Sequence, residues 1–327
     1  MKTKHLLMIP LLILTAIAGC KKDNPNDPVT PLPAPVPGQT VFQQLVATNM
    51  ANATQSFTVN AATGGQVMGN KGTQLIFEPN AFVHLDGTPV TGQVNVELVE
   101  VLSIGDMIWL NKQTVGNDNG TLRMLRSGGE LGLTVSQNGS GLRITPGGLV
   151  AKIPTNTGDP NMELFTGREN PNGGMIWTVV DSSIVDVEDD YYVDTTYVVV
   201  WPVPPITFDP ASDSLQWINC DYFWNYPSTT NITATLPTGQ STDSTLVWIG
   251  FPSENAVMNM YHTTGQSFTA WQVVPVGMQA VVVGLRVDAT GNYHSSFSTV
   301  TITSGMDVPM IFTPTTLAAF EDALNAI

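Results

Sequence analysis

Apolar and polar residues alternate with a period of two through most of the chain, which is the pattern of β-strands with one buried face. The alternating runs are short and rich in valine, isoleucine and threonine, and turn residues separate them. The pattern predicts strands at residues 57–59, 74–77, 94–99, 131–135, 175–179, 197–201, 246–251, 280–285 and 300–303. Asp-Gly and Asn-Gly pairs, which favour tight hairpin turns, stand at 86–87, 119–120, 138–139 and 172–173. We therefore expect a mainly β protein.

Two segments follow the period of a helix instead. Thr40 can cap a short helix whose apolar face is formed by Val41, Phe42, Leu45 and Val46. At the other end of the chain we expect a helix with Thr313 as its cap and Pro314 as its first residue. Its apolar stripe is formed by Leu317, Phe320, Leu324 and Ile327, and we expect this stripe to pack on the last sheet.

A proline-rich segment divides the strand-rich part of the chain. Pro202, Pro204, Pro205 and Pro210 fall between two groups of alternating runs, and proline cannot donate a hydrogen bond to a sheet. We therefore expect a first β-sandwich domain over 41–205 and a second β domain with the C-terminal helix over 206–327. The predicted fold is two β-sandwich-like domains in series, with a short N-terminal helix and a C-terminal helix.

The first nineteen residues are predicted to form an export signal. Lys2 and Lys4 precede an apolar run from residue 6 to residue 19, which is too short to span a bilayer permanently. The run ends in Ile17-Ala18-Gly19-Cys20, which resembles the lipobox of bacterial lipoproteins. The resemblance implies cleavage before Cys20 and attachment of lipid, palmitate among it, to its sulfur. An ordinary secretory signal with a coincidental cysteine is the alternative.

A tether over 20–40 follows the lipidated cysteine. It contains Pro25, Pro28, Pro31, Pro33, Pro35 and Pro37, which favour an extended spacer that rises about 3.1 Å per residue. Lys21 stands where aspartate favours retention in the inner membrane of enteric bacteria, so we expect an outer-membrane lipoprotein. The sequence leaves open whether the folded part faces the periplasm or the cell surface.

The amino-acid composition and the net charge limit the kinds of molecule that the protein can bind. Only 12% of the residues are charged and 42% are hydrophobic, which indicates a folded rather than a disordered chain. The net charge of -15 repels phosphate backbones and excludes nucleic acid as a partner.

Besides Cys20 the chain has one cysteine, Cys220. Alternation places Cys220 on the same face as Ile218, and we expect it to be a buried thiol.

A family resemblance rests on a set of motifs in the first half of the chain. These are Gly64-Gly65, Gly72-Thr73, FEPNAF at 77–82, VTGQVNVEL at 90–98, SGGE at 127–130 and QNG at 137–139. They resemble a β-sandwich domain of Bacteroidota lipoproteins, which is distantly similar to the module of netrin receptors, ankyrins and zonula occludens proteins. LQWINCD at 215–221 resembles the start of the second domain of that group, with Gln216 and Tyr222 in place of glycine and arginine. The resemblance implies a non-enzymatic interaction or scaffold module.

Catalytic and metal-binding motifs are weak in this sequence. The glycine-rich segment 65–73 is not a phosphate loop, because Asn70 separates the second glycine from Lys71, and a turn between two strands is the better interpretation. His84, His262 and His294 show no ligand spacing, so no catalytic residue, metal or cofactor is predicted. The acidic segment 181–194 is interpreted as a solvated loop, with calcium binding left open.

Aromatic residues supply a candidate ligand platform. Trp217, Tyr222, Trp224 and Tyr226 lie close together in sequence, and exposed rings of this kind bind carbohydrate or peptide, although a role in the core is the alternative. Thr195, Ser214 and Ser244 each follow an aspartate and resemble the O-glycosylation acceptors of exported Bacteroidota proteins.

The sequence therefore predicts a protein that is not an enzyme. The first hypothesis is an envelope-anchored lipoprotein that binds or scaffolds an envelope protein or glycan, held to the membrane through lipid on Cys20. The alternative is a carbohydrate- or peptide-binding accessory protein of an uptake system. A hydrolase whose site forms only in space is the third hypothesis.

Overall fold

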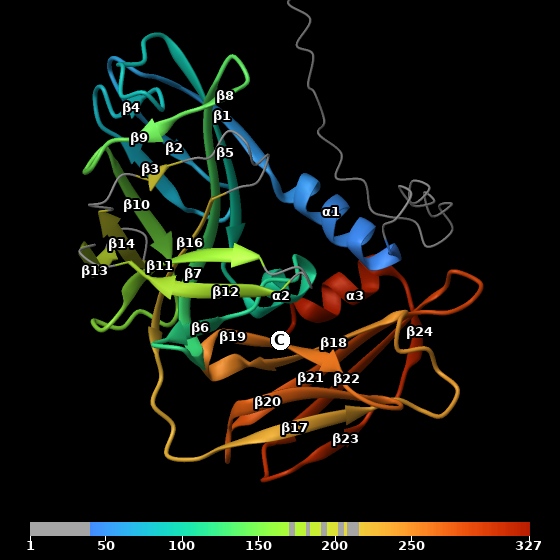
Figure 1. Ribbon diagram of the computed structural model, residues 1–327. Helices are drawn as coiled ribbons and strands as arrows, with labels where there is room; N and C mark the ends of the chain where they lie inside the picture. Colours follow the sequence, from blue (N-terminus) through green and yellow to red (C-terminus); the bar gives the residue numbers. More distant parts are fainter. Residues whose placement is uncertain (1–39, 170–173, 181–183, 191–194, 202–205, 208–215) are drawn as a thin grey trace, which may run out of the picture. The chain divides into compact units, whose positions relative to one another are not determined.

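The computed structural model describes residues 40–169, 174–180, 184–190, 195–201, 206–207 and 216–327 (Figure 1). Contacts divide the chain into a unit over Met1–Ala34 and a unit over Pro35–Ile327, and all described residues belong to the second. They form 24 strands and three α-helices, which confirms the mainly β fold. None of the described helices has the length and apolar character needed to cross a membrane.

An eight-stranded sheet forms the centre of the N-terminal half. Its long strand β7 pairs with β5 and β16 along its length, and β6 pairs with both β7 and β12. Part of the sheet thus closes into a ring, which consists of β7, β16, β11, β12 and β6. Strands β1 and β5 extend the sheet on one side of this ring. The order is β1 (Gln55–Asn60), β5 (Gln93–Val101), β7 (Thr121–Gln137), β16 (Gln216–Phe223), β11 (Glu163–Glu169), β12 (Met175–Val179) and β6 (Val115–Asp118), with β8 (Ser140–Gly141) on β7.

Two smaller sheets cover one face of this sheet. The buried core there takes alternate residues from β5, β7 and β16 on one side and from β3, β10 and β14 on the other, which is the arrangement of a β-sandwich. The second sheet has the order β13 (Ile184–Asp190), β14 (Thr195–Trp201), β10 (Leu149–Pro154), β3 (Gln74–Phe77) and β2 (Gly65–Met68). The third has β15 (Ile206–Thr207), β9 (Arg143–Ile144) and β4 (Phe82–Val83).

The C-terminal half is built from a further eight-stranded sheet. Residues from β23, at one end of the strand order, share a buried core with residues from β21 and β22 near the other end, so the sheet folds over on itself and encloses that core. A 3-10 helix η1 (Pro252–Glu254) joins β18 to β19. The order is β23 (Asp307–Pro309), β17 (Thr229–Thr235), β20 (Ser267–Pro275), β19 (Ala256–His262), β18 (Thr245–Phe251), β21 (Gln279–Val287), β22 (Tyr293–Thr301) and β24 (Thr313–Thr315).

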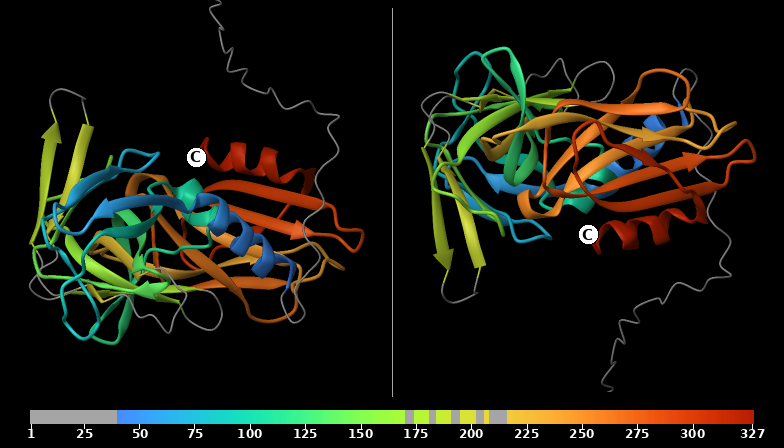
Figure 2. Two further views of the ribbon diagram at one scale, coloured as in Figure 1. Left: turned by 90° about the horizontal axis from the view of Figure 1, so that it is seen from above. Right: turned by 90° about the horizontal axis from the view of Figure 1, so that it is seen from below.

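Three helices and a shared core join the two halves. The helices are α1 (Val41–Ala53), α2 (Ile104–Trp109) and α3 (Leu317–Leu324), and Figures 1 and 2 show them near the junction. Phe42, Leu45, Met107, Phe320 and Leu324 pack there with Trp217 from β16 and Trp248 from β18. The predicted cap of the first helix is confirmed, since Thr40 and Gln43 form a capping box.

The structure corrects two predictions about the C-terminal half. Strand β16, which the proline-rich boundary assigned to the second domain, pairs with β7 and β11 and completes the first sheet. The C-terminal helix begins after Thr316, whose hydroxyl accepts from the backbone nitrogen of Ala319. Thr313 and Pro314 instead belong to β24, because pairing with His294 and Ser295 of β22 takes these residues into the sheet.

Candidate ligand-binding site

Three aromatic side chains form a stacked column at the end of β16. Tyr222 lies near the end of β16, and Trp224 and Tyr226 follow it at every second position, with the three rings stacked one after another. The ring centroids of Tyr222 and Trp224 are 5.9 Å apart with the planes inclined by 25°, and those of Trp224 and Tyr226 are 5.5 Å apart at 15°. All three rings are half-buried, which makes this column the part of the predicted platform that reaches solvent.

Arg126 on β7 fixes the column from its side. Its guanidinium carbon lies 5.1 Å from the centre of the Trp224 ring, and its Nη1 donates to the hydroxyl of Tyr222 at 3.3 Å. Its Nε lies 3.7 Å from Oε2 of Glu254, which is 4% exposed. Burial raises the pKa of the Tyr222 and Tyr226 hydroxyls and of the Glu254 carboxyl. The tyrosine hydroxyls are therefore neutral hydrogen-bonding groups at physiological pH.

Arg123 anchors the neighbouring residues in the same way. Its guanidinium carbon lies 5.1 Å from the centre of the Phe223 ring and it forms an ion pair with Asp118. Its Nη2 donates to the carbonyl oxygen of Trp224 at 3.2 Å and to Oδ1 of Asn225 at 2.5 Å. The segment after β16 is thus attached to β7 by two arginines whose charges are compensated by acidic partners.

A cavity of about 610 Å³ opens beside the column. Asn161 reaches it from the turn before β11, where its backbone nitrogen and Nδ2 donate to Oδ1 of Asp159 at 2.9 and 2.7 Å. These hydrogen bonds, together with one from Tyr222, lower the pKa of Asp159. The lining thus combines aromatic rings with amides and a carboxylate, and consists of Asn161, Glu163, Tyr222, Phe223, Trp224 and Asn225.

Trp217 is not part of this surface, contrary to the sequence prediction. It is 6% exposed and packs in the core between the two halves, with Nζ of Lys112 4.4 Å from its ring centre. The reason is the period of the strand, because Trp217 points to the face opposite Ile218 and Cys220, which pack in the sandwich core. Cys220 is the buried thiol that we expected, and burial raises its pKa well above the usual value.

Two carboxyl groups lie inside the protein next to the column. Glu130 on β7 stands opposite Asn219 of β16, and Asp221 stands opposite Ser127. Both carboxyls are 0% exposed, and burial raises the pKa of each well above its usual value. Neither oxygen of Glu130 has a hydrogen-bond partner among the residues that the structure describes, although the charge of Lys112 acts to lower its pKa. These groups are out of reach of any ligand in the cavity.

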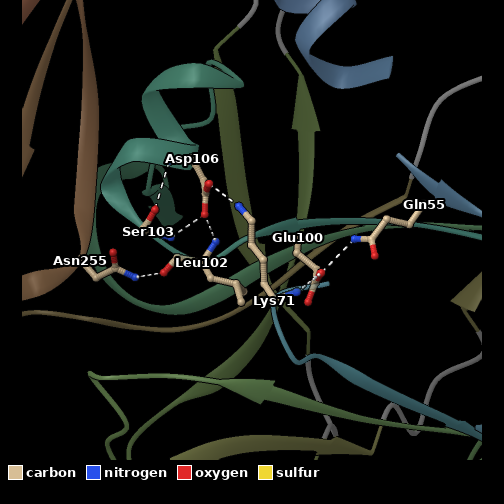
Figure 3. A network of polar contacts seen from close by, with 7 residues as sticks. All are labelled: Gln55, Lys71, Glu100, Leu102, Ser103, Asp106 and Asn255. Atoms are coloured by element: carbon tan, nitrogen blue, oxygen red, sulfur yellow. Dashed lines mark hydrogen bonds and ion pairs between the residues drawn. The ribbon is translucent and has the colours of Figure 1, made fainter. Parts of the chain in front are cut away.

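A second polar site surrounds the turn between β2 and β3 (Figure 3). This is the glycine-rich segment, and it is the predicted turn between two strands. The carboxylate of Glu100 fills the turn and accepts from the backbone nitrogens of Lys71 and Thr73 at 2.9 Å each. Nζ of Lys71 is paired with Asp106, whose other oxygen accepts from the backbone nitrogens of Leu102 and Ser103 at 2.9 and 3.0 Å.

This polar network borders a cavity of about 710 Å³, but its charged groups serve the fold. Lys71 and Asp106 attach the β2–β3 turn to the start of α2, and Nδ2 of Asn255 donates to the carbonyl oxygen of Leu102 at 3.0 Å. Since each charge already has a structural partner, this cavity is a weaker candidate than the aromatic one.

The other predicted positions are distributed over the surface. Thr195 is half-buried on β14 and lines the larger cavity, and Ser244 is half-buried just before β18. Cys20 and Ser214 lie outside the described residues, as does part of the acidic segment 181–194. The described part of that segment is strand β13 rather than a loop, and Lys152 donates to Glu188 there at 2.7 Å. Among the described residues, no group of histidine, cysteine and acidic side chains could hold a metal ion.

Comparisons with known proteins add little to this geometry. None of the protein-family models matches the sequence, and curated proteins give no significant match. Among solved structures, the chain is similar to the gamma-CGTase from alkalophilic Bacillus clarkii, with 14% identity and a TM-score of 0.20. The match covers 77% of this chain and 41% of that chain, so this chain spans less than half of that structure. A TM-score at this level supports no inference about function.

Proposed function

We propose that the protein is a non-catalytic lipoprotein of the cell envelope that binds another envelope component at the column of Tyr222, Trp224 and Tyr226. The column carries the proposal, because half-buried aromatic rings beside an open cavity with polar groups are typical of binding sites. The arginines fix the rings before a ligand arrives, so that little conformational entropy is lost on binding.

The two carboxyls with the most strongly raised pKa values lie where no substrate can touch them. Enzymes place acids and bases with shifted pKa values where they touch the substrate. Here the carboxyls with strongly raised pKa values, Glu130 and Asp221, are completely buried inside the sheet. A glycan or peptide recovered chemically unchanged after prolonged incubation with the protein would agree with this part of the proposal, and cleavage would contradict it.

The membrane anchor is the lipid on Cys20, followed by the proline-rich tether. Buried acyl chains each contribute about 0.8 kcal/mol per CH₂, and several chains together give stable attachment. We expect labelled palmitate to enter the wild-type protein and not the Cys20→Ala variant, which should leave the membrane fraction. Protease treatment of intact and lysed cells distinguishes the cell surface from the periplasmic face. A wild-type protein without lipid would refute the anchor.

The binding site is tested with the soluble part of the chain, from residue 21 onward, and washed cell envelopes. We expect the wild type to sediment with the envelopes and Trp224→Ala to lose most of this binding, because the variant removes the central ring of the column. Tyr293→Ala is a matched control, since Tyr293 is also a half-buried aromatic residue but lies on β22 in the C-terminal half. Equal binding by Trp224→Ala and the wild type would refute the proposed site.

A further inference from the structure

We propose that the ligand of the cavity beside Tyr222 and Trp224 is an uncharged glycan. This inference rests on the proposed binding function and names the class of its ligand. It follows from three properties of the site, which are the partial exposure of the rings, the polarity of the cavity lining and the compensation of the nearby charges.

The stacked rings are only partly buried. The ring centres of Tyr222 and Trp224 are 5.9 Å apart and those of Trp224 and Tyr226 are 5.5 Å apart, and all three residues are half-buried, so part of each ring is left uncovered. Tyr222 and Trp224 both line the cavity. The uncovered parts of the rings offer flat apolar contacts to the C–H face of a sugar ring, and the rings keep this geometry without a ligand.

The polar groups that line the cavity can form hydrogen bonds with the hydroxyls of a sugar, which both donate and accept. Nδ2 of Asn161 donates to Asp159, so the carbonyl oxygen is the end of this amide that a ligand would meet. Oδ1 of Asn225 accepts from Arg123, so its NH₂ group is the end that remains for a ligand. Glu163 adds an exposed carboxylate that can accept from a hydroxyl. The cavity therefore presents acceptors and a donor beside an aromatic face.

Charges near the cavity disfavour anionic ligands. Arg123 is paired with Asp118, and Arg126 lies beside Glu254, so neither arginine offers an uncompensated charge to an anion. Glu163 on the cavity wall repels anions as well. An uncharged ligand meets no such repulsion.

The test uses the chain from residue 21 onward in gels that contain one polysaccharide each. The probes are a neutral glucan, a neutral mannan, a neutral xylan and the acidic polygalacturonate, and a lysine-rich peptide is measured separately by calorimetry. We expect the wild type to be retarded by at least one neutral probe and not by the acidic one. Trp224→Ala should weaken this binding about tenfold or more, as loss of a central aromatic contact does.

Further variants keep the test valid if Trp224→Ala fails to fold. Asn161→Ala changes an exposed residue and should weaken binding to the same neutral probe several-fold. Glu163→Gln retains a hydrogen-bond acceptor and should change that binding less than Asn161→Ala does. Tyr293→Ala should bind like the wild type. The affinity should also be almost independent of salt, because no charge of the ligand takes part.

Each outcome has a defined meaning. Retardation by a neutral probe that depends on Trp224 and Asn161 supports the glycan. Binding only of polygalacturonate, or only of the lysine-rich peptide, overturns it in favour of an ionic ligand. If no probe binds while Trp224→Ala still loses binding to washed envelopes, the glycan is wrong and the proposed binding function stands. If Trp224→Ala keeps envelope binding, the proposed function itself fails.

Discussion

At the scale of single residues, Glu100 shows how one buried carboxylate can hold a turn. It is 2% exposed and accepts hydrogen bonds from the backbone nitrogens of Lys71 and Thr73 and from Nε2 of Gln55. A Cβ atom at Gly69 would lie 2.4 Å from the carboxylate carbon, so only glycine fits where the turn meets Glu100. The glycines of this segment therefore serve the turn and its internal acceptor.

We predict that Glu100→Ala lowers the free energy of unfolding by about 2 to 4 kcal/mol, because buried backbone N–H groups would lose their acceptor. The measurement is urea denaturation at neutral pH. Glu97→Ala is the control, since Glu97 lies on the same strand but is half-buried. An equal loss in both variants would show that Glu100 has no special role in the turn.

The buried carboxyls of Glu130 and Asp221 predict a pH dependence of stability. Burial raises the pKa of both in the folded state, so the folded protein retains protons that the unfolded chain releases above the usual values of 4.5 and 3.8. Their stabilising contribution is therefore present below those values and is lost as the pH rises towards the raised ones. We expect the free energy of unfolding to fall with rising pH, by up to about 1.4 kcal/mol per pH unit for each carboxyl.

Glu130→Gln isolates the contribution of one of these groups. The amide cannot ionise, so the variant should lose less stability than the wild type as the pH rises from 5 to 8. The measurement is a series of urea unfolding curves across that range. Glu163→Gln is the control, because Glu163 is exposed and should leave the slope unchanged. The same slope in Glu130→Gln and the wild type would show that Glu130 does not carry the effect.

At the scale of the elements, α3 depends on one aromatic residue. Phe320 is 1% exposed, and its ring centre lies 6.3 Å from that of Trp109 and 5.6 Å from that of Phe297. We predict that Phe320→Ala lowers the free energy of unfolding by about 3 to 5 kcal/mol, the usual cost of the cavity left by a deleted core phenylalanine. Phe297→Ala should cost less in the same urea experiment, since Phe297 is 37% exposed. Equal costs would contradict the role of α3 in the core.

The sequence predicts where the strands lie better than it predicts which strands pair with each other. Alternation identified β3 and β12 with their observed bounds, because one buried face is a local property of a strand. The position of β16 could not be found in this way, since its partners β7 and β11 lie far from it in the chain. The proline-rich segment looked like a domain boundary, but proline content reports only that local pairing stops there.

In the candidate site, too, the sequence predicts residues that are close together in the chain and does not reveal residues that come from distant strands. Tyr222, Trp224 and Tyr226 were found because they are close in sequence and of one chemical type. Arg126 and Asn161 were missed, since they approach the column only through the pairing of β7, β16 and β11. Period-two alternation alone places Trp217 on the opposite face from these even-numbered positions.

At the scale of the molecule, the two halves share a core and a set of hydrogen bonds. Thr114 of the N-terminal half donates from its backbone nitrogen to the carbonyl oxygen of Val257 on β19 at 2.8 Å. Its hydroxyl accepts from the backbone nitrogen of Val257 at 2.9 Å, and Asn259 donates to Oε1 of Gln113 at 3.1 Å. Trp217 and Trp248, from different halves, pack in one cluster. Neither half can therefore separate without exposing apolar surface.

We predict that this junction makes unfolding a single cooperative transition. Calorimetry should show one peak whose van't Hoff enthalpy equals its calorimetric enthalpy. Thr114→Val removes the hydroxyl acceptor of a buried backbone N–H while keeping the shape of the side chain, and should lower the free energy of unfolding by about 1 to 3 kcal/mol. Because the junction holds both halves, the variant should shift the whole peak downward. Thr58→Val, an exposed position on β1, should leave it in place. Two resolved peaks in the wild type would show that the halves unfold independently, and that the shared core only brings them into contact.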